Sequence, residues 1–245
     1  MPAERGAQAE LRIEGLTAGY GAGPIVRDVA IAVERGTIVT IIGPNGSGKS
    51  TLLKAVVGVL RPSSGKVIVA GEDLAGRRSD AIARHGIGYV PQVRPIFPRL
   101  TVRENLEIGG YTLPRRLVQQ RIAAVLDVFP PLASILGRRA GNLSGGEGKM
   151  LGIGRVLMTE PSVVILDEPT ADLAPRMAQQ VLQDYVTRLA QLGAAVLMVE
   201  QRASDALAIA DWAYVMRGGE VAISESAAAM REREDIGHLL LGVID

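Results

Sequence analysis

The chain contains Gly43-Pro44-Asn45-Gly46-Ser47-Gly48-Lys49-Ser50, which fits the phosphate-loop pattern G-x-x-x-x-G-K-[ST] at every fixed position. An apolar run over residues 37–42 precedes this stretch, and a helix-like run over residues 49–60 follows it. In this strand–loop–helix setting, glycines allow a tight turn that points successive backbone N–H groups at phosphate oxygens. The alternative, a glycine-rich turn that binds nothing, is disfavoured by the flanking strand and helix.

The helix that starts at this loop adds free N–H groups and a dipole, both of which favour an anion. Lys49 supplies a point charge for the outer phosphates, and the Ser50 hydroxyl can ligate Mg²⁺. The predicted nucleotide contacts in this part of the chain are Gly43, Pro44, Asn45, Gly46, Ser47, Gly48, Lys49, Ser50 and Thr51.

Length and composition limit the classes of protein to consider. The chain has 245 residues, 47% of them hydrophobic, which suits one large α/β domain or two small ones. The formal net charge is +1, so bulk charge gives no argument for nucleic acid as a partner. Cysteine is absent, which excludes disulfides and thiolate metal sites. No apolar run resembles a signal peptide or membrane helix, so we expect a soluble chain whose membrane role, if any, comes through a partner.

Strand-like patterns dominate the first part of the chain, and several of these strands could pair antiparallel. They cover residues 11–18, 25–33, 37–42, 66–70 and 87–90. The pattern over residues 101–136 is helical, broken by Pro114 and by Pro130-Pro131. Because sheet-like patterns resume afterwards, we interpret this helical block as an insertion in an α/β core.

The second part of the chain returns to α/β patterns. Residues 163–166 are apolar on both faces, which is typical of a central parallel strand. Further elements are predicted at residues 175–192 (helix), 194–199 (strand), 212–216 with 220–224 (hairpin) and 227–245 (a mostly helical tail). We predict an α/β fold with a mixed-sheet core, an antiparallel β subdomain and an inserted α-helical subdomain. The single domain 1–245 then divides into a core (1–91 and 160–225), a helical subdomain (92–159) and a C-terminal tail (226–245).

An acidic pair follows the predicted central strand. Asp167 can hold Mg²⁺ at the end of such a strand, and Glu168 can orient and polarise an attacking water. A solvent-facing acidic pair is the plain alternative. The phosphate loop expected in the same sheet favours the catalytic interpretation.

The stretch Leu143-Ser144-Gly145-Gly146-Glu147 has the spacing of a capping box at Ser144 and Glu147. Beyond a plain helix cap, it resembles the signature motif of ATP-binding cassette (ABC) ATPases, and the resemblance covers nearly the whole chain. In that family two cassettes sit head to tail, and each signature turn closes on the γ-phosphate held by its partner. The resemblance implies the ABC-ATPase fold, ATP and Mg²⁺ as cofactors, and nucleotide contacts at Ser144, Gly145, Gly146 and Glu147.

Two further positions match that family, and a third departs from it. Tyr20 matches the aromatic residue that stacks on adenine, although a core tyrosine is the alternative. Gln92 matches the glutamine that meets Mg²⁺ and the attacking water; its alternative is a polar loop residue. Gln201 stands where the family usually has a switch histidine, and a glutamine donates a hydrogen bond but cannot titrate. The implied catalytic set is Lys49, Glu168 and Gln201, with Gln201 as a positioning contact, and the implied metal ligands are Ser50, Gln92 and Asp167.

Two short stretches resemble one group within the family. Val199-Glu200-Gln201 and Leu173-Ala174-Pro175 look like the second ATPase subunit (LivF type) of branched-chain amino-acid importers, and similar cassettes serve urea and short amides. Gly148 and Lys149 depart from the usual glutamine-rich run after the signature glutamate. The implied partners are a second ABC ATPase subunit (a paralogue, or the same chain as a homodimer), two integral membrane permease subunits and, indirectly, a substrate-binding protein. The implied location is the cytoplasmic face of the cell membrane.

Three alternatives stay open at this point. They are a lipid or lipopolysaccharide export cassette, a non-transport ABC ATPase, and a regulatory module that binds ATP without turnover. Gln201 argues against the first, the chain length against the second, and Lys49 with Glu168 against the third. The arginine pairs 77–78, 115–116 and 138–139 are interpreted as solvated charges, with contact to lipid headgroups or a membrane subunit as a minor alternative.

Overall fold

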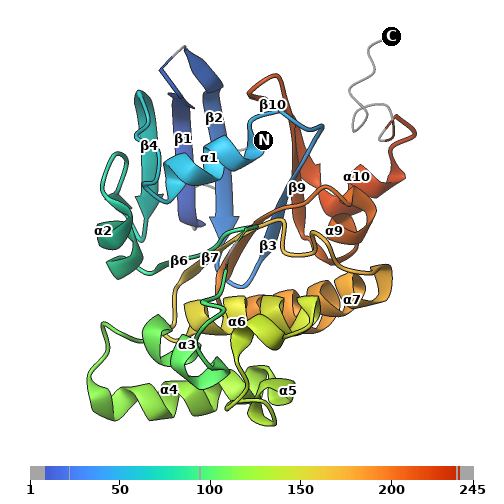
Figure 1. Cartoon of the computed structure of the whole chain (residues 1–245). Coiled ribbons are helices and arrows are strands. Elements are labelled where there is room, and N and C mark those ends of the chain that lie inside the picture. The colour runs from blue at the N-terminus through green and yellow to red at the C-terminus, as the bar shows by residue number, and fades with distance from the viewer. Residues whose placement is uncertain (1–8, 22, 94, 236, 238–245) are drawn as a thin grey trace.

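A computed structural model describes residues 9–21, 23–93, 95–235 and 237 of the chain (Figure 1). The first sheet is antiparallel, in the order β2-β1-β4-β5. Its strands are β1 (Ala9–Gly19), β2 (Pro24–Glu34), β4 (Ser64–Val69) and β5 (Glu72–Asp73). Leu11 and Ile13 of β1 are buried while Arg12 and Glu14 are partly exposed, so the predicted half-exposed strand is confirmed.

The second sheet has six strands in the order β10-β9-β3-β8-β7-β6. Its strands are β3 (Ile38–Ile42), β6 (Ile87–Val90), β7 (Val163–Asp167), β8 (Ala195–Val199), β9 (Trp212–Arg217) and β10 (Glu220–Ser226). Neighbouring strands are parallel except for the β9–β10 hairpin. Every residue of β3, β7 and β8 is buried, as expected for strands covered on both faces.

The helical block contains α3 (Val102–Gly109), α4 (Arg115–Val128), α5 (Pro130–Ala133), the 3₁₀ turn η2 (Ala140–Asn142) and α6 (Gly145–Leu157). The predicted breaks at Pro114 and at Pro130-Pro131 are confirmed. In Figure 1 this block lies below the parallel sheet, on the side opposite α1 and the antiparallel sheet.

The remaining helices are α1 (Lys49–Val56), α2 (Ser79–Arg84), α7 (Pro175–Gln180), the π-helical turn η3 (Val181–Val186), α8 (Thr187–Gln191), α9 (Ala203–Ile209) and α10 (Ala227–Glu232). The prediction that the first helix continues to residue 60 was wrong. Gly58 has φ 71°, and a side chain there would meet the Arg77 carbonyl oxygen at 2.4 Å, so the chain turns away after Val57. The predicted helical tail is confirmed over α10, but residues 233–235 are not helical. The rest of the predicted tail, residues 236 and 238–245, lies outside the described residues.

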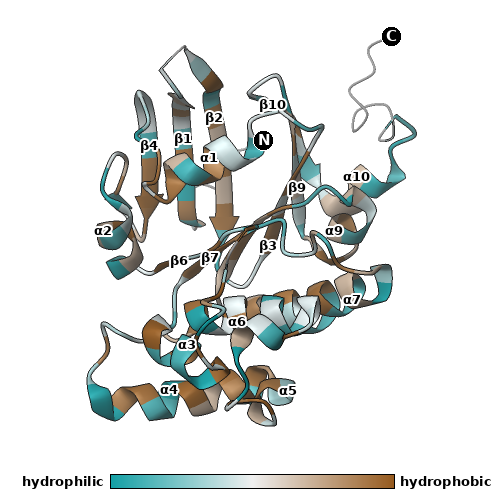
Figure 2. Cartoon of the chain, in the orientation of Figure 1, coloured by the Kyte–Doolittle hydropathy of each residue, from teal (hydrophilic) through white to brown (hydrophobic). Residues whose placement is uncertain are grey.

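Alternate residues of the buried strands supply two different hydrophobic clusters. Val163, Ile165 and Leu197 join the cluster beneath α1 and the antiparallel sheet. Val164 and Leu166 point the other way, into a cluster shared with the helical block. Figure 2 shows the apolar colouring concentrated in these central strands. None of the described helices is long and apolar enough to cross a membrane.

Candidate functional site

The phosphate loop connects β3 to α1, and its shape depends on glycine. Gly43 and Gly48 have φ values of 146° and 100°. An added Cβ would lie 2.2 Å from the Met216 carbonyl oxygen at the first position and 2.7 Å from Val26 Cγ1 at the second. Helix α1 begins directly after Gly48, so its first free N–H groups lie at this loop. The predicted strand–loop–helix context of the pattern is therefore present.

The side chains of the loop fit an anionic ligand. Lys49 is 6% exposed, and its ammonium donates to the carbonyl oxygens of Gly43 (2.7 Å) and Pro44 (2.9 Å). Burial lowers the Lys49 pKa, opposed by the nearby carboxylates of Glu168 and Asp167. The Ser47 hydroxyl is buried and has no hydrogen-bond partner among the described residues, so a donor is available for a phosphate oxygen.

Asp167 ends β7 beside the start of α1. One carboxylate oxygen accepts from the Ser50 hydroxyl at 3.4 Å and the other from the Tyr89 hydroxyl at 3.1 Å. Burial raises the Asp167 pKa, partly offset by these two hydrogen bonds. Sequence reasoning missed Tyr89; its only signal was its position in the strand that pairs with β7. A hydroxyl beside a single carboxylate suits Mg²⁺, which keeps waters and phosphate oxygens among its ligands.

Glu168 lies in the left-handed region at φ 48°, and it is 7% exposed. Its carboxylate accepts from the Gln92 amide at 2.8 Å and from the Gln201 amide at 3.0 Å to both oxygens. Its backbone N–H donates to the Val199 carbonyl at 2.9 Å. The structure thus brings three of the predicted residues together around one carboxylate. In this arrangement Gln92 contacts Glu168, and its expected role as a metal ligand stays a prediction.

Lys149 and Glu200 lie near Glu168 and were not predicted as site residues. Lys149, on α6, places its ammonium 3.5 Å from the Gln92 carbonyl oxygen and 3.4 Å from the Glu168 carbonyl oxygen. Burial lowers the Lys149 pKa. Glu200 is 2% exposed and accepts from the Thr170 N–H at 2.9 Å. Burial raises the Glu200 pKa.

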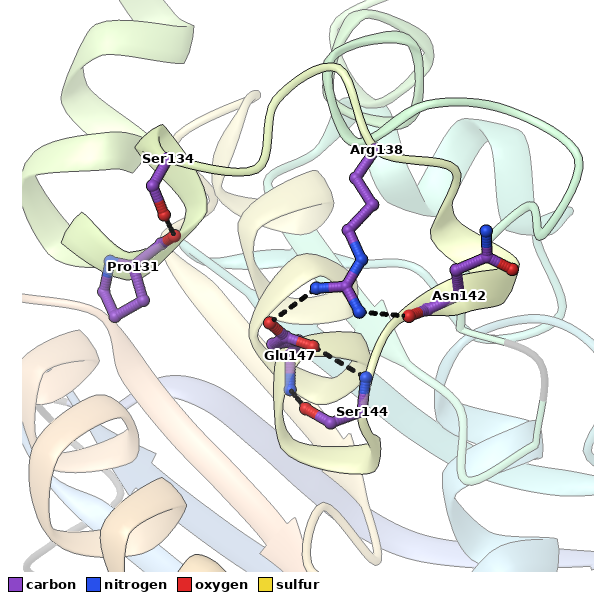
Figure 3. Close-up of polar contacts among 6 residues, drawn as sticks. All are labelled: Pro131, Ser134, Arg138, Asn142, Ser144 and Glu147. Atoms are coloured by element: carbon purple, nitrogen blue, oxygen red, sulfur yellow. Dashed lines mark hydrogen bonds and ion pairs between the residues drawn. The ribbon is translucent and has the colours of Figure 1, made fainter.

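The signature turn is a capped helix start (Figure 3). The Ser144 hydroxyl accepts from the Glu147 N–H at 3.3 Å, and the Glu147 carboxylate accepts from the Ser144 N–H at 2.7 Å. That backbone hydrogen bond is the main reason why the Glu147 pKa is lowered. Ser144 and Gly145 are exposed, whereas Gly146 is buried against Met177. The capping box is confirmed, and the exposed edge of the turn is available to another molecule.

Arg138 holds this turn from outside the helix. Its guanidinium donates to the Glu147 carboxylate at 3.2 Å and to the Asn142 carbonyl oxygen at 2.5 Å (Figure 3). Arg138 is exposed, as expected for a solvated charge, but its contacts with the turn were not predicted, because they depend on how η2 folds back onto α6. Tyr20, by contrast, is 49% exposed at the end of β1, which excludes a core tyrosine.

A phosphate loop, a strand-end aspartate and a buried, hydrogen-bonded glutamate, all at the ends of parallel strands of one sheet, define a nucleotide-binding phosphate-loop ATPase. The model of the family described as "ABC transporter" matches residues 26–171, and the chain belongs to this family of ATP-binding, ATP-hydrolysing proteins. ATP-binding subunits of ABC transporters act in complexes with membrane components and are membrane-associated in that way. The fold class expected from the sequence is confirmed.

Known proteins similar to the chain include two transport ATPases. The high-affinity branched-chain amino acid transport ATP-binding protein BraG of Pseudomonas aeruginosa is 41% identical, covering 91% of this chain and 95% of its own. The probable branched-chain amino acid transport ATP-binding protein LivF of Archaeoglobus fulgidus is 39% identical, covering 96% and 100%. A crystal structure of an ATP-binding cassette of an ABC transporter in its ADP conformation is 29% identical, with a TM-score of 0.86 and coverage of 96% and 99%.

Proposed function

We propose that the chain is the ATP-hydrolysing subunit of an ABC importer for branched-chain amino acids or a related small polar solute such as urea or an amide. The observation that carries the proposal is the Glu168 carboxylate, held by two amides beside Asp167 and Lys49. Support for the solute class comes from the two similar proteins and from Gln201, which stands where related cassettes carry histidine.

ATP binding is assigned to the phosphate loop. Lys49 moves its ammonium from the Gly43 and Pro44 carbonyls to the outer phosphates, and the backbone N–H groups at the start of α1 donate to the phosphates. Tyr20 stacks its exposed ring on adenine. Ser50, Asp167 and Gln92 would hold Mg²⁺, which would supply positive charge against the phosphates.

Hydrolysis is assigned to Glu168. Its carboxylate accepts a hydrogen bond from the attacking water and so orients the oxygen toward the γ-phosphate. Gln92 and Gln201 fix the carboxylate through their amide N–H groups. Neither amide titrates, so the proton of the water has only Glu168 as a nearby acceptor among these three side chains. Catalysis is mainly positioning and charge stabilisation.

A second cassette completes the site. The exposed Ser144 and Gly145, with Gly146 and Glu147 behind them, cap the nucleotide held by the phosphate loop of a paralogous subunit or of a second copy. The helical subdomain, residues 92–159, carries this turn, and Gln92 is the first residue of the subdomain. Two membrane permease subunits on the cytoplasmic face, served by a substrate-binding protein, use the closure and opening of the pair for transport.

The decisive experiment compares Glu168→Gln with Lys49→Ala in the purified full chain. Glu168→Gln keeps ATP binding and lowers turnover by about 10²–10⁴-fold, the range of general acid–base contributions. Lys49→Ala weakens ATP binding itself. Lys66→Ala is the matched control, because Lys66 is exposed on β4. Steady turnover by Glu168→Gln would overturn the assignment. Reconstitution with the membrane subunits and binding protein then tests the solute: stimulation of ATPase activity by leucine assigns the importer to branched-chain amino acids, and stimulation by urea or an amide assigns it to the related solutes.

A further inference from the structure

Helix α6 connects two parts of the molecule that the proposed function uses separately. Its first turn is the signature turn, capped by Ser144. Farther along the same helix, the Lys149 ammonium reaches the carbonyl oxygens of Gln92 and Glu168, at 3.5 and 3.4 Å. A helix rises about 1.5 Å per residue, so the cap and the lysine lie on one rigid segment less than two turns long.

The two carbonyls that Lys149 contacts belong to the loops that follow β6 and β7. The side chains of the same two residues are already joined, since the Gln92 amide donates to the Glu168 carboxylate at 2.8 Å. Lys149 therefore joins the backbones of the two loops, whereas the Gln92–Glu168 hydrogen bond joins their side chains. A left-handed glutamate needs its backbone held by its surroundings, and Lys149 contributes one of those contacts.

The charges around Lys149 explain why an ammonium can lie there. Burial lowers the Lys149 pKa, and this effect is opposed by the carboxylates of four residues, in decreasing order Glu200, Asp172, Glu168 and Asp167. Lys149 therefore lies among four acidic side chains, beside the loops that carry the catalytic residues.

We propose that Lys149 is a positioning residue that couples the signature turn to Glu168 of the same chain. When Ser144 engages the nucleotide of the neighbouring subunit, α6 moves as a unit and Lys149 carries that movement to the backbone of Glu168. Each chain then hydrolyses its own ATP in response to the nucleotide that it caps on its neighbour. The coupling rests on the proposed function, because the engagement of the neighbour is part of that proposal.

The test uses Lys149→Met, Lys149→Arg and the exposed control Lys66→Met in the full chain. We expect Lys149→Met to lower kcat for ATP by about 10- to 100-fold, as a misplaced catalytic group does, and to change KM by less than about twofold. The Hill coefficient for ATP falls toward one. Lys149→Arg restores most of kcat, because a guanidinium keeps the charge and the donors. Unchanged kcat and Hill coefficient in Lys149→Met would overturn the proposal.

A second measurement does not depend on turnover. Hydrogen–deuterium exchange reports the Ala171 N–H, which donates to the Glu168 carbonyl at 3.1 Å, the same oxygen that Lys149 contacts. We expect faster exchange at this loop in Lys149→Met and wild-type exchange in Lys66→Met. Unchanged exchange counts against the positioning role. If the wild-type chain hydrolyses no ATP, the proposed function fails, and the exchange result still decides whether Lys149 holds the loop.

Discussion

At the scale of the single residue, Glu200 is a buried carboxyl group whose protonation is linked to stability. It is 2% exposed, and burial, with Glu168 nearby, raises its pKa above the ordinary value. The folded state therefore holds the Glu200 proton more tightly than the unfolded chain does. The stability contributed by the protonated form is fully present below the unfolded-state pKa and is lost as the pH rises through the folded-state pKa.

Glu200→Gln should remove this dependence, because a glutamine does not titrate and its carbonyl oxygen can still accept from the Thr170 N–H. The free energy of unfolding of Glu200→Gln relative to wild type is expected to increase as the pH rises from the unfolded-state pKa of Glu200 to its folded-state pKa. Above the folded-state pKa the difference should stay constant. Urea unfolding between pH 4 and 8 measures it. A difference that is the same at every pH contradicts the argument.

The residues that sequence reasoning found are those fixed by local pattern. The phosphate loop, Asp167, Glu168 and the Ser144–Glu147 cap each follow from neighbours in the chain. Tyr89, Lys149 and Arg138 were missed because their contacts depend on strand register and on how separate elements pack. Lys149 could be noticed only as a departure from a family pattern, with no sign of where its ammonium would lie.

At the scale of the element, the packing of α3 on α6 depends on one glycine. A Cβ at Gly109 would lie 2.3 Å from the Arg155 carbonyl oxygen, which is backbone and cannot rotate away. Gly109→Ala is therefore expected to lower the free energy of unfolding by about 1–3 kcal/mol, as overpacking does. Gly148→Ala is the matched comparison: its Cβ has space, and alanine in a helix is favoured over glycine by roughly 0.5–1 kcal/mol.

Denaturant unfolding of both variants measures these opposite effects. Equal destabilisation by Gly109→Ala and Gly148→Ala would contradict the argument, because close packing would then not explain why glycine is needed at position 109. Exchange rates at α3 and α6 amides localise the change to the helical block.

Elements were predicted well where one pattern dominated. The wholly apolar runs of β3, β7 and β8 indicated buried strands, and prolines marked the helix breaks. The strand order β10-β9-β3-β8-β7-β6 was not predictable, because an apolar run shows that a strand is buried on both faces without showing which strands lie beside it. The first helix was predicted too long because its apolar pattern continues past the point where Gly58 approaches Arg77.

At the scale of the whole molecule, nucleotide binding should stabilise both hydrophobic clusters together. The phosphate loop follows β3 and the carboxylates follow β7, and residues of both strands enter both clusters. ATP at 100 times its dissociation constant adds about 2.7 kcal/mol to the free energy of unfolding. For a chain of this size that corresponds to a rise in Tm of roughly 5–10 °C.

Thermal unfolding with and without Mg²⁺-ATP checks this expectation. Glu168→Gln should keep the full rise in Tm, and Lys49→Ala should lose it. A rise of the same size in Lys49→Ala would mean that ATP stabilises the protein from a different site.

The left-handed backbone at Glu168 has an evolutionary consequence. A non-glycine residue at positive φ is held there at a conformational cost of order 1 kcal/mol or more, so glycine would relieve strain that the glutamate carries. A lineage freed from the need to turn over ATP would gain stability by replacing this glutamate with glycine, while its phosphate loop remained intact. Descendants that bind ATP without cleaving it are therefore easy for mutation to reach, and only continued demand for hydrolysis keeps the acid in place.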